Sequence, residues 1–174
     1  MDKVTVENNG YLAQPPAEPN MPQAAVTVRK GSLTETTIRN NLGEFVGGLQ
    51  IEASGKVTVT NSEISGNLGC SAGGVAGEAD LVMSGVTIRG NTGITAGGVA
   101  LMGYEDPLTL TLSGTAEHPT LITGNRAAMP DFPSYYEGQA NSEVSPMAGG
   151  VLTNRAVLSG DVTVKGNYDG QGTG

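Results

Sequence analysis

The stretch that decides the fold is GGVAGEADLVMSGVTIRGNTGITA, residues 73–96. It opens with a glycine pair followed by an aliphatic residue, and it contains the signature Ile88-Arg89-Gly90-Asn91. The same signature, a β-branched residue, two spacers and an asparagine, starts again at Ile38, Ile64, Ile122 and Val164. Glycine pairs recur at 47–48, 97–98 and 149–150. These recurrences form an internal repeat, which sets the architecture before residue propensities are considered.

The repeat has the length and the periodicity of a β-solenoid coil. Its 24 residues are too few for a βαβ unit, which needs about 30 or more. Apolar residues alternate at every second position, as in strands, and no sustained helical spacing occurs. We therefore predict an all-β parallel β-helix of four to five coils, each about 24 residues long with three short strands. The first strand of each coil follows a glycine pair and begins at Leu49, Val75, Val99 or Val151. The second strand carries alternating apolar residues, namely Val57/Val59, Leu81/Met83, Leu110/Leu112 and Ala156/Leu158. The third strand ends in one of the five signatures above.

Stacking such coils places equivalent side chains above one another. The β-branched residues then form an internal aliphatic column: Ile38, Ile64, Ile88, Ile122 and Val164. The asparagines form a ladder in which each side-chain amide hydrogen-bonds to its neighbours: Asn41, Asn67, Asn91, Asn125 and Asn167. Corners need unusual backbone angles, which we assign to the glycine pairs and to Asn61, Gly85, Gly114 and Gly160. Asn40 replaces the usual glycine of the signature, and asparagine tolerates left-handed backbone.

The glycine pair and the signature together resemble the repeats of the polymorphic outer-membrane-protein family, whose motifs are GGA[ILV] and FxxN. Gly73-Gly74-Val75-Ala76 with Ile88-Arg89-Gly90-Asn91 carries the resemblance, which covers roughly residues 25–167. The chain departs from the family by using Ile or Val in place of Phe. The resemblance implies a right-handed parallel β-helix on a bacterial surface, in an adhesin or an autotransporter passenger.

Two regions interrupt the repeat. Residues 1–24 contain a strand at 4–6 and then a proline-rich linker or cap, whereas residues 25–174 form the β-helix domain. Within that domain we predict loop inserts at 103–119 and 126–148. Inserts in solenoids often form the binding surface. The candidate binding residues are accordingly the aromatic and acidic residues of the inserts: Tyr104, Glu105, Asp106, Phe132, Tyr135 and Tyr136. The alternative is that the second insert folds back, so that its rings cover an exposed face of a sheet.

The composition restricts the function. A formal charge of −8 argues against a nucleic-acid surface, which needs clustered cations. No apolar run has the length of a membrane span, and no signal-peptide pattern follows Met1. We therefore expect a fragment of a larger secreted protein. Cys70, the one cysteine, is interpreted as a structural thiol at a corner.

The sequence shows no catalytic constellation. Glycosidic cleavage needs two carboxylates facing one bond, and we expect the acids of the repeat not to fall at equivalent positions in adjacent coils. His118, the one histidine, is interpreted as a solvated loop residue, and we predict no metal and no cofactor. Outward threonines at 37, 87 and 163 suggest a test for ice binding, but Glu63 and Leu121 interrupt their column and Arg39, Arg89 and Lys165 roughen the face.

We therefore expect a non-enzymatic cell-surface or secreted module that acts as an adhesin or a rigid stalk. Its contacts run through the inserted loops to a protein or glycan on a host or neighbouring cell. A polysaccharide-active lyase or hydrolase, or a fragment of one, is the alternative from another class. A self-assembling filament subunit is the third hypothesis, because the open ends of a solenoid expose unpaired strands that associate end to end.

Overall fold

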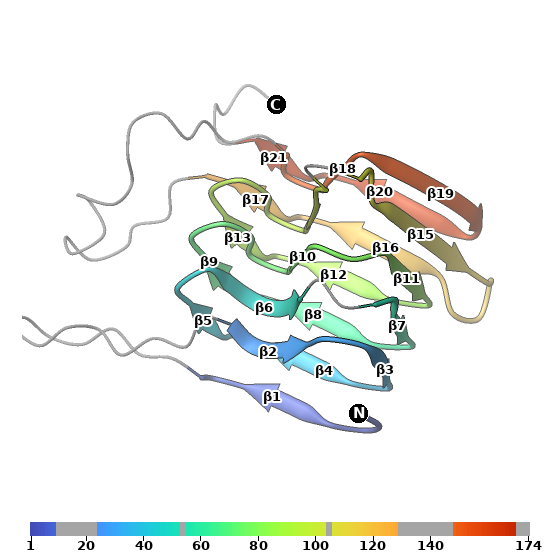
Figure 1. Ribbon diagram of the computed structural model, residues 1–174, viewed down its shortest axis with the longest axis horizontal. Helices are drawn as coiled ribbons and strands as arrows, with labels where there is room; N and C mark the ends of the chain where they lie inside the picture. The colour runs from blue at the N-terminus through green and yellow to red at the C-terminus, as the bar shows by residue number, and fades with distance from the viewer. Residues whose placement is uncertain (10–23, 53–54, 104–105, 129–147, 170–174) are drawn as a thin grey trace, which may run out of the picture.

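The chain winds as a parallel β-solenoid. The computed structural model describes residues 1–9, 24–52, 55–103, 106–128 and 148–169, which form 21 strands and no helix. The strands pair in parallel within four sheets, and each sheet takes one strand from each successive turn of the chain. The first strand and the last lie at opposite ends of the stack (Figure 1). The predictions of an all-β chain and of a parallel solenoid are confirmed.

The four sheets are named here by what they contain. The isoleucine sheet consists of β1 (Thr5–Glu7), β4 (Thr37–Arg39), β8 (Glu63–Ser65), β12 (Thr87–Arg89), β16 (Thr120–Thr123) and β20 (Val162–Lys165). The glycine sheet consists of β2 (Ala24–Val28), β6 (Val46–Ile51), β10 (Val75–Gly77), β14 (Val99–Leu101) and β18 (Val151–Thr153). The leucine sheet consists of β3 (Gly31–Thr34), β7 (Val57–Thr60), β11 (Leu81–Ser84), β15 (Thr109–Gly114) and β19 (Arg155–Gly160).

The short sheet is the one that the sequence did not predict. It consists of β5 (Leu42–Gly43), β9 (Leu68–Gly69), β13 (Thr92–Gly93), β17 (Arg126–Ala127) and β21 (Tyr168–Asp169). Each of its strands directly follows a ladder asparagine and spans only two residues, so no alternation of apolar residues marks it. A coil therefore has four strands where three were predicted. Residues 126–128 of the predicted second insert belong to the coil, since Ala128 donates its N–H to the carbonyl of Gly93.

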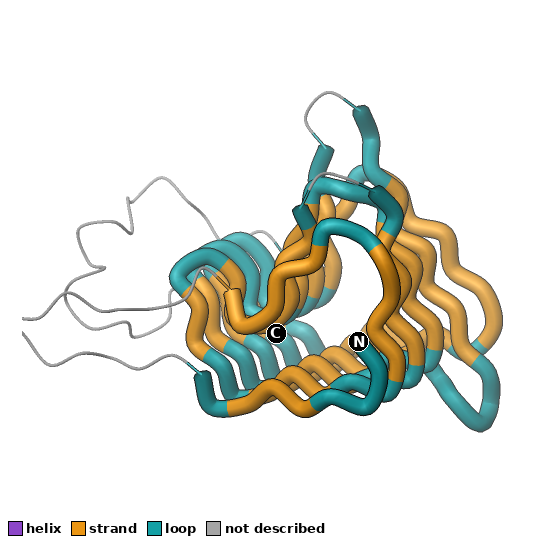
Figure 2. Tube along the Cα trace, turned by 60° about the horizontal axis from the view of Figure 1, so that its bottom comes forward, coloured by secondary structure: helices purple, strands orange, loops and turns teal. Residues whose placement is uncertain are grey.

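The predicted aliphatic column is present and in register. Ile64 pairs with Ile38 and Ile88, and Ile88 pairs with Ile122. All four isoleucines are at most 1% exposed, and they pack against the interior residues of the leucine and glycine sheets. Val164 continues the register but is 45% exposed, because it lies in the last described coil. Figure 2 shows how the strands of successive coils lie in rows.

The asparagine ladder runs beside this column. The side-chain amide of Asn91 donates to Oδ1 of Asn125 at 2.9 Å and to the carbonyl of Ile64 at 2.9 Å. Its own Oδ1 accepts from the backbone N–H and the side chain of Asn67, both at 2.9 Å. Asn41, Asn67 and Asn125 repeat this arrangement. Among the described residues, no buried side-chain nitrogen or oxygen lacks a hydrogen-bond partner, so the ladder meets the requirement that buried amides impose.

The solenoid begins earlier than the sequence analysis expected. Residues 1–24 were set apart from the coils, yet β1 pairs with β4 and places Val6 beside Ile38. Asn9 donates its backbone N–H and its side-chain amide to Oδ1 of Asn41 at 3.0 Å, so it is the first member of the ladder. Residues 6–9 read Val-Glu-Asn-Asn, a sixth copy of the signature.

The corners use left-handed backbone at two places in each coil. The residue before each ladder asparagine has a positive φ: Asn8, Asn40, Gly66, Gly90, Gly124 and Gly166. The corner between the leucine and isoleucine sheets has positive φ at Lys3, Glu35, Asn61, Gly85 and Gly160. The assignments of Asn40, Asn61, Gly85 and Gly160 are therefore confirmed. Gly114 does not have a left-handed φ; a methyl group on it would lie 2.2 Å from the carbonyl oxygen of Asp161.

The glycine pairs serve a different purpose from the one predicted. None of them has a left-handed φ. A methyl group on Gly73 would lie 2.4 Å from the backbone nitrogen of Thr92, and one on Gly74 would lie 2.4 Å from the carbonyl oxygen of Gly98. The Gly74 position is also 3.2 Å from Cγ2 of Ile88 and 3.3 Å from Nδ2 of Asn91. The pairs are glycine because the two repeated motifs touch across a thin interior.

Replacing Asn91 with alanine removes the amide from the middle of the ladder. The buried N–H and amide of Asn67 then lose their acceptor, and the carbonyl of Ile64 loses its donor. We expect a loss of about 3 kcal/mol in the free energy of unfolding, measured by urea denaturation. The control is Asn9→Ala at the exposed end of the ladder, where water replaces the amide. Equal losses in the two variants would contradict the role assigned to the buried ladder.

Alanine at Gly74 and at Gly90 separates steric from conformational requirements. Gly74→Ala should cost about 3 kcal/mol, the upper end for overpacking. Gly90 has φ +61 and open space around it, so Gly90→Ala should cost only about 1 kcal/mol. Gly90→Asn should be almost neutral, because Asn8 and Asn40 occupy equivalent positions. Thermal and urea unfolding measure all three, and a tolerated Gly74→Ala would refute the close-contact explanation.

Candidate functional site

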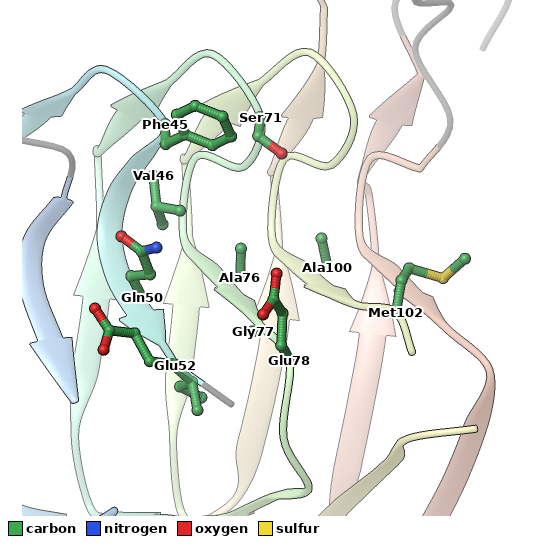
Figure 3. A pocket seen from close by; sticks show the side chains of 11 residues that line it. Phe45, Val46, Gln50, Glu52, Ser71, Ala76, Gly77, Glu78, Ala100 and Met102 are labelled. Atoms are coloured by element: carbon green, nitrogen blue, oxygen red, sulfur yellow. The ribbon is translucent and has the colours of Figure 1, made fainter. Parts of the chain in front are cut away.

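A groove of about 240 Å³ crosses the outer face of the glycine sheet (Figure 3). Strand alternation produces its floor. Leu49 and Ile51 point inward and are at most 1% exposed, so Gln50 between them points outward. The residues paired with Gln50 in the next two coils are Ala76 and Ala100, whose short side chains keep the floor low. Beneath one side of the groove, Val46, Ala72 and Ala96 pack with Ala100 in a second small apolar cluster.

Two exposed apolar side chains stand along this floor. Phe45 lies in the connection between β5 and β6 and is 55% exposed. Met102 follows β14 and is 37% exposed. The residues that succeed Phe45 in the next coils are the small polar Ser71 and Thr95, because Val46, Ala72 and Ala96 are bridged in register. The phenyl ring therefore projects beside shorter neighbours and presents its surface to solvent.

Two carboxylates lie across the floor from Phe45, in the column that Met102 continues in the next coil. Glu52 and Glu78 directly follow the paired residues Ile51 and Gly77, so they occupy equivalent positions in adjacent coils (Figure 3). The expectation that no acids of the repeat would do so was wrong. Arg29 contacts Glu52 at 2.5 Å, and this hydrogen bond, together with the charge of Glu52, raises the pKa of the Arg29 guanidinium. Glu78 is exposed.

The groove thus combines an aromatic ring, an apolar floor, one amide and two carboxylates. An exposed ring offers a flat apolar surface with little rotational entropy to lose. Carboxylates accept hydrogen bonds from hydroxyl and ammonium groups, and the Gln50 amide both donates and accepts. The arrangement is therefore suited to a ligand with an apolar face and a hydroxyl-rich edge, and its charge disfavours an anionic ligand.

The sequence-predicted binding residues lie elsewhere or outside the described part. Tyr104, Glu105, Phe132, Tyr135 and Tyr136 fall outside the described residues. Asp106 is described and exposed; it lies between β14 and β15, and it does not line the groove. Phe45 was not predicted. It stands two residues before a glycine pair, as Ser71 and Thr95 do, and its large aromatic side chain at a position that is otherwise small and polar was the available signal.

A second, polar hollow of about 540 Å³ lies where the leucine and isoleucine sheets meet. Glu35, Glu63 and His118 line it, and Glu63 is paired with Arg89 at 2.8 Å. His118 is exposed, as predicted, and its backbone N–H donates to Oγ1 of Thr115. Within the described ranges, no group of three or more His, Cys, Asp or Glu residues is arranged to hold a metal ion. A further ion pair, between Lys3 and Glu35, lies at this corner. Another, between Arg39 and Glu7, lies on the isoleucine sheet.

Fold and groove together define the class: a parallel β-solenoid with an open groove on one side face. Comparison with known protein families, with curated proteins and with solved structures finds no match for the chain. The part of the chain that the structure describes contains no helix of the length and apolarity that a membrane crossing requires.

Cys70 lies near the groove, after β9, and is half-buried. Burial and, to a smaller extent, the negative charge of Glu44 raise the pKa of its thiol to about 11. The thiolate is the nucleophile, so the folded protein should react with iodoacetamide at neutral pH roughly a hundredfold more slowly than its urea-unfolded form.

The pH dependence of this reaction provides the control. The labelling rate of the folded protein should keep rising up to about pH 11, whereas that of the unfolded chain levels off near the ordinary thiol value of 9.0. Because the unfolded state loses the proton first, the same shift lowers stability as the pH rises through this window. Rapid labelling of the folded protein at neutral pH would contradict the assignment of a structural thiol.

Proposed function

We propose that the chain is a non-enzymatic module of a bacterial cell-surface or secreted protein, and that it binds glycans in the groove of the glycine sheet. The observation that carries this proposal is Phe45, a 55% exposed ring that faces an alanine floor. Exposed aromatic rings beside convergent polar groups are a typical feature of ligand sites. The resemblance of the repeats to those of bacterial surface proteins supports the cellular location.

The charge of the groove narrows the ligand class. Glu52 and Glu78 repel anionic sugars and attract hydroxyl or ammonium groups, so we propose a neutral or amino-substituted glycan. A protein segment is the competing ligand. It is less favoured because the groove lies over the middle of a sheet, where every strand is already paired on both sides, so a peptide cannot extend the sheet by main-chain hydrogen bonds.

The solenoid itself supplies the stalk function. Each coil contributes parallel strands that pair above and below, and the ladder ties the coils together. We propose a right-handed winding with a basic coil of about 24 residues, lengthened by inserts. Crossovers between parallel strands of one sheet are right-handed in about 98% of cases, and the resemblance implies the same hand. Such a rod holds the groove at a fixed distance from its point of attachment.

A glycoside hydrolase is the second candidate, and the stacked pair Glu52 and Glu78 is the observation that favours it. Two carboxylates on one groove are the minimum requirement for glycosidic cleavage. However, the Glu52 carboxylate already forms an ion pair with Arg29 at 2.5 Å, so it is not free to face a glycosidic bond together with Glu78. We therefore keep the binding module as the principal proposal and test cleavage directly.

Phe45→Ala should weaken binding to glycans identified on an array at least about fivefold, since truncation of a central aromatic contact typically costs more than about 1 kcal/mol. The measurement is isothermal titration with neutral and amino-substituted oligosaccharides. Tyr168→Ala is the matched control, because Tyr168 is 56% exposed but lies far along the chain in β21. Equal weakening by both variants would refute the groove as the binding site.

Two further experiments test the competing explanations, namely hydrolysis and binding through the second insert. If Glu52→Gln with Glu78→Gln abolishes a slow release of reducing ends that the wild type shows, the chain is a hydrolase. If binding instead depends on Phe132, Tyr135 and Tyr136, the triple alanine variant loses it and Phe45→Ala does not. Exclusive binding of anionic glycans would contradict the electrostatic part of the proposal.

A further inference from the structure

The charges along one edge of the groove are only partly balanced. The residues that directly follow the strands of the glycine sheet form one column in register across four coils: Arg29, Glu52, Glu78 and Met102. Arg29 forms an ion pair with Glu52 at 2.5 Å. In the part of the chain that the structure describes, no cation pairs with Glu78. The column therefore contains a cation, two carboxylates and an uncharged residue, in that order.

Glu78 carries the charge that remains unbalanced. Neighbouring strands lie about 4.8 Å apart, and like charges directly opposite each other on such strands destabilise a sheet. Arg29 offsets this repulsion from one side of Glu52 only. A second cation, placed between Glu78 and the uncharged Met102, would balance the column, and the described residues do not supply one. The arrangement is thus complementary to a positively charged group on a ligand.

The Glu78 carboxylate is directed into the groove. Figure 3 shows it turned toward the floor formed by Ala76 and Ala100, whereas the Glu52 carboxylate extends away from Glu78. The short side chains of the two alanines leave the space beside the Glu78 carboxylate open to a ligand. An ammonium group in this space would donate a charge-assisted hydrogen bond, which is shorter and stronger than one between neutral groups.

The positions of Phe45 and Glu78 set a minimum length for the ligand. Phe45 precedes β6 and Glu52 follows it, and the six residues of this strand extend over about 20 Å. Glu78 lies at the same end of the floor as Glu52, because the two are in register. A sugar ring that stacks on Phe45 therefore cannot place its own amino group at Glu78. The two contacts belong to different units of an oligosaccharide.

We propose that the ligand of the groove is an oligosaccharide with primary ammonium groups, and that Glu78 selects it by pairing with one of them. This inference rests on the proposed function of the groove as a glycan site. Phe45 supplies an apolar contact that does not depend on the charge of the sugar. Glu78 supplies the discrimination between a charged amino sugar and its neutral N-acetylated form. Glu52 discriminates less, because Arg29 already neutralises it.

A pair of oligosaccharides with the same backbone tests this selection. Oligomers of glucosamine carry ammonium groups, and N-acetylation of the same oligomers removes the charge. Isothermal titration at about pH 6 keeps the glutamates ionised. At low ionic strength we expect the protein to bind the glucosamine oligomer about fivefold more tightly, the upper range for one exposed charge pair. The preference should disappear in about 1 M salt, where charges are screened beyond about 3 Å.

Glu78→Gln should abolish the preference and leave the affinity for the N-acetylated oligomer unchanged. The variant should fold normally, since the substitution removes a contact between like charges. Glu117→Gln is the matched control, because it removes the same charge from the exposed connection between β15 and β16. It measures the general attraction between a chain of charge −8 and a cationic ligand, and it should retain the preference.

Met102→Lys provides the converse test. Met102 is in register with Glu78 one coil away, as Arg29 is with Glu52. The introduced ammonium group should therefore pair with Glu78 and abolish the preference for the glucosamine oligomer. Met102→Gln is its control: it changes the same side chain without adding a charge, so it should keep the preference.

The outcomes separate this inference from the proposed function. Equal binding of both oligomers by the wild type, with both weakened by Phe45→Ala, would overturn the selection by Glu78 while the groove remains the binding site. A preference that survives Glu78→Gln would overturn it as well. Absence of binding by both oligomers would also overturn the inference, whereas the proposed function fails only if no glycan on the array binds.

Discussion

The structure depends on one set of contacts, the close approach of each glycine pair to the signature of its own coil and to the glycine pair of the next coil. The Gly74 backbone lies so close to Ile88 and Asn91 that a single methyl group would collide with its surroundings. This closeness keeps the interior thin enough for aliphatic residues to fill without large rings. It also holds the asparagine amides at hydrogen-bond distance from coil to coil, near 2.9 Å. Aliphatic packing, amide hydrogen bonding and strand register are thus consequences of one repeated distance.

Because the interior is fixed by stacking, variation is confined to outward positions. The outward residues Gln50, Ala76 and Ala100 belong to one column, and the small size of Ala76 and Ala100, not a special backbone, makes the groove. On the isoleucine sheet the outward residues include long charged side chains that pair across coils, as Arg89 does with Glu63. Such exposed pairs contribute little to stability, about 0–1 kcal/mol each. The faces of the solenoid therefore differ in what they can bind while sharing one scaffold.

The sequence predicts the scaffold better than the site. Register between Ile38, Ile64, Ile88 and Ile122 follows from a signature that any reader can align, and the structure confirms it. The stacking of Glu52 over Glu78 is predictable in the same way, since each follows the first residue of its glycine pair by five. The short sheet lacked any periodic signal. The exposure of Phe45 depends on neighbouring coils having small residues, which becomes visible only once the coils are stacked.

The ladder runs in the same direction in every coil, since each asparagine donates its amide to Oδ1 of the next asparagine along the chain. Adjacent coils are therefore held in one register, and the residues that line the groove repeat at the spacing of paired strands, about 4.8 Å. A ligand that reaches from Phe45 to Glu78 has to match this spacing, because the two side chains belong to different coils. The rigid scaffold, rather than the conformation of a loop, thus determines the length of ligand that fits the groove.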